Sequence, residues 1–336
     1  MQDPMVPFLR RRHLLQGALA ASVAPALAFP AHATGGAWPQ KAVRLIVGFP
    51  PGSSPDALAR TVADPLSQAL GQAVIVENKV GAAGAIGVNV VAKANDGHTI
   101  GLTGNVPLTT AKMLNPATPY DVARDLRPIS MVASSPFVLA GSLDMPATDL
   151  RGLLAYAKAQ GDRLSYGSIG LGAGSHLAME LLKTLTGIRA VHVPFPGFPQ
   201  VATALMGKQI DLSFMIPSIA APQAKSGRLR LYGVSTATPF AAFAEVPPIQ
   251  SALGRQQAFD VASWNAIVGP ASMPAPIAQR LSDEITRILK APDVRQRLFD
   301  QGWQAQGTAP EALSRQIAQD TAMWGDVIKR TGVRSE

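Results

Sequence analysis

The chain has 336 residues, a formal charge of +8 at pH 7 and no cysteine, which excludes disulfides, thiolate metal sites and cysteine nucleophiles. Lysine and arginine are scattered, often beside acidic residues, without the basic runs and flanking aromatic residues that a nucleic-acid surface needs. We therefore expect no nucleic-acid partner. The length allows one large domain or two ordinary ones.

The N-terminus has the pattern of an export signal. Arg10, Arg11 and Arg12 precede a mostly apolar run over residues 14–29, and Ala31-His32-Ala33 follows. A basic start, a short apolar core and an A-x-A site describe a secretory signal peptide, and the paired arginines also fit a twin-arginine signal. We expect residues 1–33 to be this signal, cleaved near Ala33; the alternative is a buried N-terminal helix. Without the signal's three arginines and one aspartate the charge is +6.

The rest of the chain alternates strand and helix patterns. Residues 43–47 are a short β-rich run, which the turn-forming segment 50–55 ends. Apolar residues at four-residue spacing from Leu58 to Leu70 then predict a helix, and Gly71 ends it. We expect further strands at 74–76, 99–102, 136–140, 164–167, 191–193 and 210–214, and further helices up to Ala94, over 149–160, 175–186 and 199–206, and around 277–288 and 313–328.

This alternation indicates an α/β fold with mainly parallel sheets and right-handed crossovers. Two such units divide near residues 135–140. We expect lobe 1 to comprise residues 34–137 plus 260–336, and lobe 2 residues 138–259. No flexible linker separates the units, which favours a hinge of a few crossing strands with a ligand cleft between the lobes.

Catalytic and metal signatures are missing from the sequence. Ser168 lacks the first glycine of a nucleophile elbow. Ser175 and His176 are neighbours on a predicted helix and project about 100° apart, so His176 cannot act as a general base for Ser175. His98 and His192 stand alone on or beside strands, which is typical of structural histidines, and the two-histidine helix signature of metal sites is absent. We expect no catalytic residues and no metal.

A nucleotide site is the alternative to consider. The strand at 74–76 is followed by Gly81, Gly84 and Gly87, in a strand–loop–helix arrangement like that of a dinucleotide fold. The spacing is G-x-x-G-x-x-G, whereas the fingerprint is G-x-G-x-x-G, and the acidic residue expected about 20 positions later has no convincing counterpart. We expect no cofactor, and a nucleotide- or cofactor-dependent α/β enzyme stays as the alternative function.

Two loops indicate an anion site more strongly. Residues 50–56 and 167–175 each leave a predicted strand and open a helix. Small residues let the backbone approach a ligand, and the free N–H groups at a helix start favour an anion. One such loop per lobe suits a small carboxylate that is held at both ends, and Gly170→Val is expected to block it without unfolding the chain. The alternative is turn and N-cap chemistry, with Ser54 or Asp56 and Ser175 as caps.

An ordered series of short segments carries a family resemblance over essentially the whole mature chain. The chain resembles the substrate-binding receptors of tripartite tricarboxylate transporters, the Bug-type periplasmic receptors. The matching segments are residues 46–52 with Asp56 and Arg60, 76–79 with Gly81, Gly84 and Gly87, 96–99, 120–121, 125–129, 166–174 with His176, 193–195, 207–211, 227–230 and Trp264.

The resemblance implies a class II-like, Venus-flytrap receptor that binds a small carboxylate between its lobes and delivers it to a membrane permease of the tripartite tricarboxylate type. It implies a periplasmic monomer without enzymatic activity, which grips its ligand through backbone amides, hydroxyls and bridging waters. The positions that carry over are Phe49, Gly52, Ser53, Ser54, Asp56 and Asn105 from lobe 1, and Ser168, Ile169, Gly170, Gly174, Ser175, His176, Phe195, Gly197 and Asp211 from lobe 2.

The chain departs from the family pattern in the first loop and again after Pro194. Ser53 replaces a second glycine, Pro55 is an unusual proline, and Phe195-Pro196-Gly197 stands where tyrosine-lysine-glycine is usual. The last change removes a hydroxyl and a cation near the cleft. We therefore expect a less polar or aromatic acid as ligand.

Overall fold

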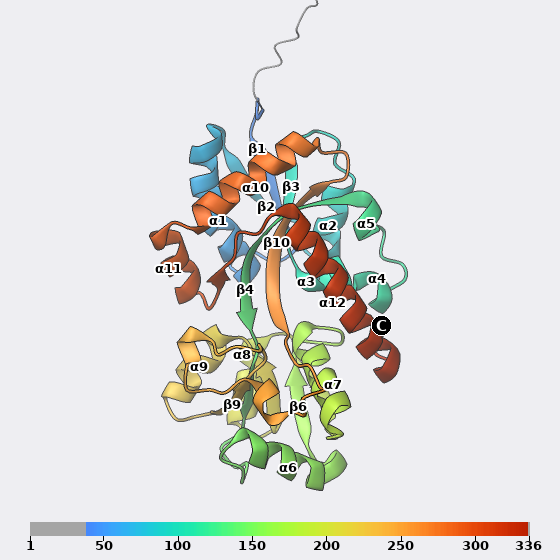
Figure 1. The fold of residues 1–336 in the computed structure, drawn as a ribbon, viewed down its shortest axis with the longest axis vertical. Helices are drawn as coiled ribbons and strands as arrows, with labels where there is room; N and C mark the ends of the chain where they lie inside the picture. The colour runs from blue at the N-terminus through green and yellow to red at the C-terminus, as the bar shows by residue number, and fades with distance from the viewer. Residues whose placement is uncertain (1–37, 335–336) are drawn as a thin grey trace, which may run out of the picture. The chain divides into compact units, whose positions relative to one another are not determined.

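Two β-sheets organise the chain in the computed structural model, which describes residues 38–334 (Figure 1). The predicted signal peptide and its cleavage site lie outside the described residues. The first sheet has the strand order β11-β4-β10-β3-β1-β2 and the second β7-β6-β8-β5-β9. The strands are β1 (Val43–Val47), β2 (Val74–Asn78), β3 (Thr99–Gly104), β4 (Leu126–Pro136), β5 (Val138–Gly141), β6 (Ser165–Ser168), β7 (Val191–Pro194), β8 (Leu212–Met215), β9 (Arg230–Val234), β10 (Ala262–Pro270) and β11 (Gln304–Ala305).

Helices follow most strands. The α-helices are α1 (Ser54–Leu70), α2 (Ala85–Ala92), α3 (Asn105–Thr109), α4 (Ala111–Leu114), α5 (Val122–Asp125), α6 (Leu150–Gln160), α7 (Gly174–Thr186), α8 (Phe198–Met206), α9 (Pro217–Lys225), α10 (Ala275–Leu289), α11 (Pro292–Asp300) and α12 (Pro310–Thr331). Those of the described chain include every predicted helix and five that were not predicted, α3, α4, α5, α9 and α11. None of the helices within residues 38–334 has the length and apolar character needed to cross a membrane.

The strand directions correct one expectation, because both sheets are mixed and not mainly parallel. β1 pairs in parallel with β2 and β3, and β6 pairs in parallel with β7 and β8. In contrast, β10 is antiparallel to β3 and β4, and β5 is antiparallel to β8 and β9. A parallel pair needs a crossover connection. The chain passes between the sheets without a crossover α-helix: β4 continues almost directly into β5, and within the described chain no α-helix lies between β9 and β10.

The chain changes sheets twice. It leaves the first sheet after β4, at Phe137, and returns to it at Ala262, where β10 begins. We use lobe 1 and lobe 2 for the predicted parts, which are divided at 137/138 and 259/260.

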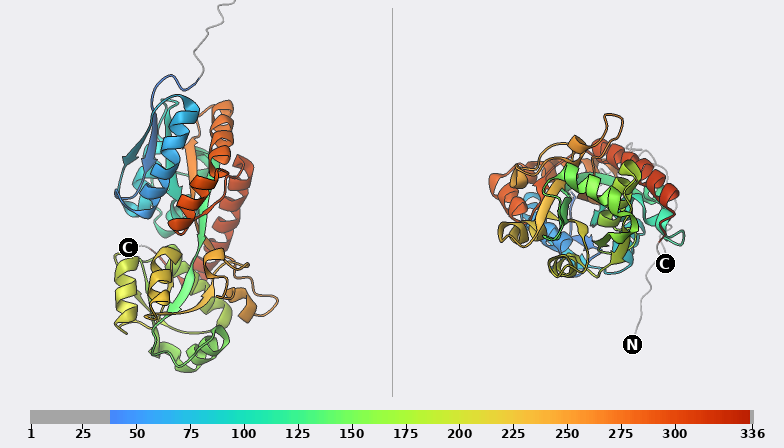
Figure 2. Two further views of the ribbon diagram at one scale, coloured as in Figure 1. Left: turned by 90° about the vertical axis from the view of Figure 1, so that its left-hand side faces the viewer. Right: turned by 90° about the horizontal axis from the view of Figure 1, so that it is seen from below.

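Helices cover both faces of the first sheet, and successive side chains of a strand pack into opposite cores. Leu45 of β1 packs in one core with Leu58 of α1 and Leu281 of α10, whereas Ile46 packs in another with Val88 of α2. Figure 2 shows α1 and α10 side by side over one face. α1 ends at Gly71, which has the left-handed conformation (φ +68°) that favours glycine. This packing fixes the start of α1, and with it the first predicted site loop.

The last helix contributes to the cores of both sheets. Leu313 of α12 packs in the lobe 1 core with Trp264, whereas Trp324 and Ile328 lie in the lobe 2 core with Leu177 of α7. In Figure 1, α12 runs from beside β10 towards the second sheet. The end of α12 therefore packs against α7 of lobe 2.

Candidate ligand-binding site

Asp56 holds the first loop together. Its side chain is only 3% exposed. Oδ2 accepts hydrogen bonds from the Gly52 backbone N (2.9 Å) and Arg60 Nε (3.0 Å). Oδ1 accepts from Asn78 Nδ2 (2.9 Å) and Arg60 Nη2 (3.1 Å). With both carboxylate oxygens occupied, Asp56 shapes the turn at Gly52 (φ +77°) and does not present a free acceptor to a ligand.

The charge of Asp56 is strongly stabilised. Burial raises the pKa of this carboxyl, but hydrogen bonds from Arg60, Asn78 and Gly52 outweigh burial and lower the pKa to about 2. The carboxylate is therefore ionised at every pH at which the protein is expected to function, and it stays bonded to the loop.

α1 begins without a side-chain cap. Its N-cap residue, Ser53, is extended, and the buried Ser53 Oγ has no hydrogen-bond partner. Ser54 Oγ instead accepts from Trp303 Nε1 (2.9 Å), so neither Ser54 nor Asp56 is the cap that turn chemistry alone would suggest. Within residues 38–334 the backbone N–H groups of Ser54 and Asp56 have no acceptor. They are donors available to an anion.

The second loop, between β6 and α7, is drawn together by Ser168. Ser168 Oγ lies 2.6 Å from His192 Nε2 and 3.1 Å from the carbonyl O of Gly170, and it accepts from the Gly170 backbone N at 3.2 Å. Gly170 has φ +118°, so the predicted Gly170→Val test would strain the backbone and affect more than binding.

His192 is not isolated, which corrects the sequence-based interpretation. Its ring stacks on that of His176, with the centroids 4.1 Å apart. His176 Nδ1 in turn accepts from the Gly172 backbone N (3.0 Å). The two histidines are 16 positions apart on different elements, so spacing along the chain gave no signal of this pair.

Much of the loop backbone is already bonded within the loop. The Ile169 N–H donates to Ser175 Oγ (3.4 Å), and the Ala173 N–H donates to the Gly170 carbonyl (3.2 Å). α7 has Ala173 as its N-cap and no side-chain cap, so Ser175 is not the cap that was considered. In this loop and the first turn of α7, the backbone N–H groups that have no acceptor among the described residues are those of Leu171, Gly174, Ser175 and His176.

Of the other predicted residues, Phe195, Gly197 and Asn105 lie near the carboxyl ends of the strands that carry the site, whereas Asp211 does not. Phe195 lies beside the second loop, because its backbone N donates to the Ser168 carbonyl (2.8 Å), and Gly197, two residues later, is the N-cap of α8. Asn105 begins α3 and donates through Nδ2 to the Ala262 carbonyl (3.4 Å). Asp211, in contrast, accepts from the N and Oγ of Ser165 (2.7 and 2.9 Å), at the opposite end of β6 from Ser168. Asp211 is therefore placed apart from the loop.

Asn265 is a polar residue that sequence reasoning missed. It is 3% exposed, and its Oδ1 has no partner. It pairs across the sheet with Gly104, the residue before Asn105, at the edge where β1 and β3 end. Only the antiparallel pairing of β10 with β3 places it there, and that pairing is invisible in the local pattern.

The glycine-rich segment over 81–87 serves packing, which argues against a nucleotide site there. A Cβ on Gly48 would lie 2.6 Å from the Cα and O of Gly84, and one on Gly87 would lie 2.7 Å from the Cα of Gly48. The glycines therefore let two backbones touch. The helix that follows, α2, has only 8 residues.

The geometry for acid–base chemistry is incomplete. Ser168 and His192 form a short contact, but Ser168 is fully buried, and no carboxylate hydrogen-bonds to His192 among the described residues. A nucleophile needs access to substrate, and its base needs an orienting group. Residues 38–334 also contain no cluster of three His, Cys, Asp or Glu side chains that could hold a metal.

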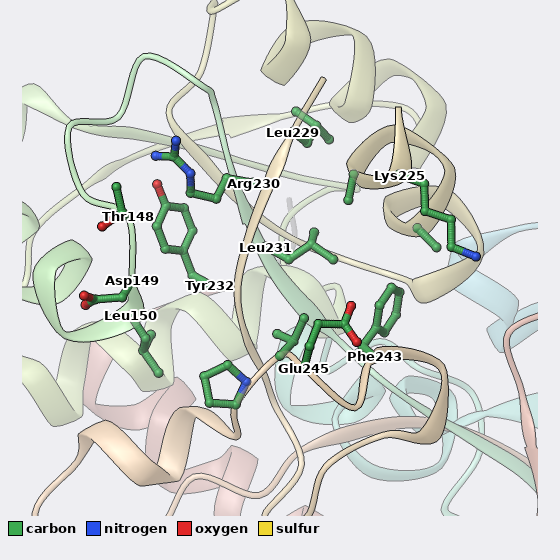
Figure 3. Close-up of a pocket in the computed structure, with 14 residues that line it drawn as sticks. Thr148, Asp149, Leu150, Lys225, Leu229, Arg230, Leu231, Tyr232, Phe243 and Glu245 are labelled. Atoms are coloured by element: carbon green, nitrogen blue, oxygen red, sulfur yellow. The ribbon is translucent and has the colours of Figure 1, made fainter. Parts of the chain in front are cut away.

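A cavity of about 500 Å³ lies in lobe 2, away from all the predicted site residues (Figure 3). Its lining includes Arg230 and Tyr232, which lie together beside Thr148, with Lys225 at the other end. Arg230 Nη1 donates to two backbone carbonyls, one of them that of Ala147 (2.6 Å), and the Tyr232 hydroxyl donates to the same oxygen (2.9 Å). These polar groups hold the segment before α6, so we assign no ligand to this cavity.

Two α/β lobes joined by crossing strands, each with a helix start that offers free amides, define a two-lobed solute-binding protein. The model of the tripartite tricarboxylate transporter family receptor matches residues 58–333. A UPF0065 protein of Bordetella bronchiseptica is 36% identical over 321 residues, which cover 94% of each chain. BugT of Bordetella pertussis is 30% identical over 299 residues, 88% of this chain and 91% of BugT.

Solved structures agree with this assignment. Rpa4515 of R. palustris with adipate has a TM-score of 0.77 and 28% identity, covering 88% of this chain and 99% of that one. MatC from Rhodopseudomonas palustris with bound malate has a TM-score of 0.73 and 28% identity, covering 87% and 100%. The chain belongs to the tripartite tricarboxylate transporter receptor family, which confirms the resemblance and the two-lobed binding-protein fold.

Proposed function

We propose that this protein is an exported receptor that binds a small carboxylate between its lobes and delivers it to a tripartite tricarboxylate-type permease, without chemical turnover. The observation that carries the proposal is the pair of helix starts. α1 and α7, one in each lobe, follow glycine-containing loops, lack side-chain caps and have free backbone donors at Ser54, Asp56, Gly174, Ser175 and His176. Carboxylates bound to two relatives of the same fold support the ligand class.

The ligand is expected to contact both lobes only when they are closed. Binding energy then selects the closed state, which is the form presented to the permease. The side chains around the second loop favour an acid with an apolar body: Ile169 is 37% and Leu171 45% exposed, and Phe195, whose N–H bonds to the Ser168 carbonyl, is partly buried. Asp56 and Asp211 support the fold of the site and are left out of the ligand contacts.

Thermal unfolding of the mature protein against a panel of carboxylates tests this proposal. The panel contains malate, adipate, citrate, acidic amino acids and aromatic acids. A ligand at 100 times its Kd adds about 2.7 kcal/mol of stability, which raises Tm by several degrees. No response from a preparation shown to be free of retained ligand would contradict the proposal, as would chemical conversion of a bound acid.

The variant Ser175→Pro tests the helix start directly. Proline removes one free N–H, together with the Oγ that accepts from the Ile169 N–H, but it is tolerated in the first turn of a helix. We expect the variant to keep its fold and to lose most of the Tm response. Glu311→Pro is the matched control, because it places proline at the same position of α12 on an exposed residue. If carboxylates raise Tm equally in wild type and Ser175→Pro, the ligand does not bind at the start of α7.

A further inference from the structure

The two stacked histidines together fix both glycines of the β6–α7 loop. His176 holds Gly172 directly, through the bond from the Gly172 N–H to Nδ1. His192 holds Gly170 through Ser168, whose Oγ contacts both the imidazole and the Gly170 backbone. Gly170 and Gly172 have φ +118° and +72°. The turn they make leads straight into Gly174, where the free donors of α7 begin.

The His176 side chain is buried. The residue is 3% exposed, and two aromatic rings lie close to its own. His192 lies against it at 4.1 Å, and the ring of Tyr166 lies nearly parallel to it with the centroids 6.2 Å apart. Its Nδ1 is used by Gly172, and its Nε2 points towards Glu180 Oε1, 3.9 Å away. Only its backbone N–H is free for binding.

The surroundings keep this imidazole neutral. Glu180 is the nearest carboxylate, but it already accepts from the Tyr166 hydroxyl (2.5 Å) and from Lys183 Nζ (2.7 Å). The α12 side chains in this core, such as Trp324, are apolar. Burial, and after it the neighbouring His192, lower the pKa of His176 to about 4 against the opposing effect of Glu180. Burial lowers the pKa of His192 too.

We propose that His176 and His192 are positioning residues: a neutral, stacked pair that holds the β6–α7 loop in the shape that presents the α7 amides to the carboxylate. The inference rests on the proposed function. It gives the His176 side chain a task other than the ligand contact that the family resemblance implies. It also assigns a task to His192, which no ligand prediction included. Protonation of His176 Nδ1 would turn the acceptor for Gly172 into a second donor, so the loop needs the neutral ring.

Two substitutions separate the hydrogen bond from the packing. His176→Leu fills the buried space but offers no acceptor, whereas Asn Oδ1 in His176→Asn can take the place of Nδ1. Hydrogen exchange of the segment 168–176 measures the loop without any ligand. We expect exchange at least about tenfold faster in His176→Leu, equivalent to about 1.4 kcal/mol, with most of the protection restored in His176→Asn. His98→Asn, in lobe 1, is the matched control and should leave this segment unchanged.

Binding then provides an independent measurement, with malate and adipate as probes. His176→Leu should weaken binding about tenfold, and His176→Asn should recover most of it. Between pH 7 and 4 the wild type should lose affinity faster than His176→Asn, because both proteins share His192 and the protonation of the ligand, and only the wild type has the His176 ring. Parallel pH profiles would contradict the need for a neutral histidine.

The outcomes distinguish this inference from the proposed function. Exchange in His176→Leu within twofold of wild type overturns the positioning role, whatever the ligand. Faster exchange with unchanged carboxylate affinity would show that the histidines hold the loop but that the loop is not the binding site, which removes both the inference and its site. A wild type that binds no carboxylate refutes the proposed function, and with it the purpose assigned to the pair.

Discussion

Replacing Asp56 by asparagine tests how the first loop is held. The carboxylate accepts four hydrogen bonds, from Gly52, Asn78 and two nitrogens of Arg60. Asparagine keeps the size but places an NH₂ group against these donors. The folded pKa of about 2 against the ordinary 3.8 corresponds to about 2.4 kcal/mol of stability at neutral pH.

The sign of the pH effect follows from the lowered pKa. Stability from a carboxylate with a depressed folded pKa is complete above its unfolded pKa and is lost as the pH falls through the folded value. The contribution of Asp56 should therefore be full at pH 5 to 7 and about half as large at pH 3. The Asp56→Asn variant, which does not titrate here, lacks this dependence.

Urea unfolding at pH 7, 5 and 3 measures the difference. We expect Asp56→Asn to be less stable than wild type by about 2 kcal/mol at pH 7 and 5, and by about half of that at pH 3. Asp64→Asn, on the exposed side of the same helix, is the control and should change little. A difference of the same size at pH 7 and pH 3 would refute the reasoning, because it would then arise from packing and not from the charge.

Three further substitutions probe the framework by thermal or urea unfolding. Gly48→Ala should cost about 3 kcal/mol or prevent folding, because its Cβ would lie 2.6 Å from the Gly84 backbone; a cost under about 1 kcal/mol would contradict that contact. Asp320→Asn should gain stability relative to wild type as the pH rises from 4 to 7. The reason is that burial raises the pKa of Asp320, even though Trp264 Nε1 donates to its carboxylate (2.6 Å). A stability difference between the two proteins that does not change with pH would contradict a buried charge at Asp320. Leu114→Ala should cost about 2–4 kcal/mol of stability, since this buried side chain of α4 lies in the lobe 2 core. Because Leu58 of α1 packs in a different core, the costs of Leu114→Ala and Leu58→Ala should add in the double variant. A negligible cost of Leu114→Ala would contradict its placement.

The regular framework could be predicted from the sequence because burial sets its pattern. The strand at Val43–Val47 has the predicted bounds, and the helix that ends at Gly71 has its apolar residues on the buried face. The long strands β4 and β10 were not predicted. The β4 sequence contains buried Ser130 and Ser135 among its apolar residues and is covered on both faces, so it lacks the alternation that marks a half-buried strand.

The site was predictable only as far as its loops. Small residues after a strand and before a helix indicate an anion site, but they do not tell which donors are already bonded. Asp211 shows the difficulty, because its partner Ser165 is 46 positions away. The pairing of His176 with His192 likewise depends on the parallel arrangement of β6 and β7. Such contacts are tertiary, and no local periodicity encodes them.

The two loops are held by opposite electrostatic means, and this difference has a consequence for ligand release. The first depends on an ionised Asp56 with a pKa of about 2, and the second on a neutral His176 with a pKa of about 4. As the pH falls from 7, His176 is protonated before Asp56, so the lobe 2 loop should loosen while the lobe 1 loop keeps its shape. A bound carboxylate would then lose its lobe 2 contacts first and stay associated with lobe 1. Because the proposed closure depends on contacts with both lobes, acid should favour the open state before it unfolds the protein.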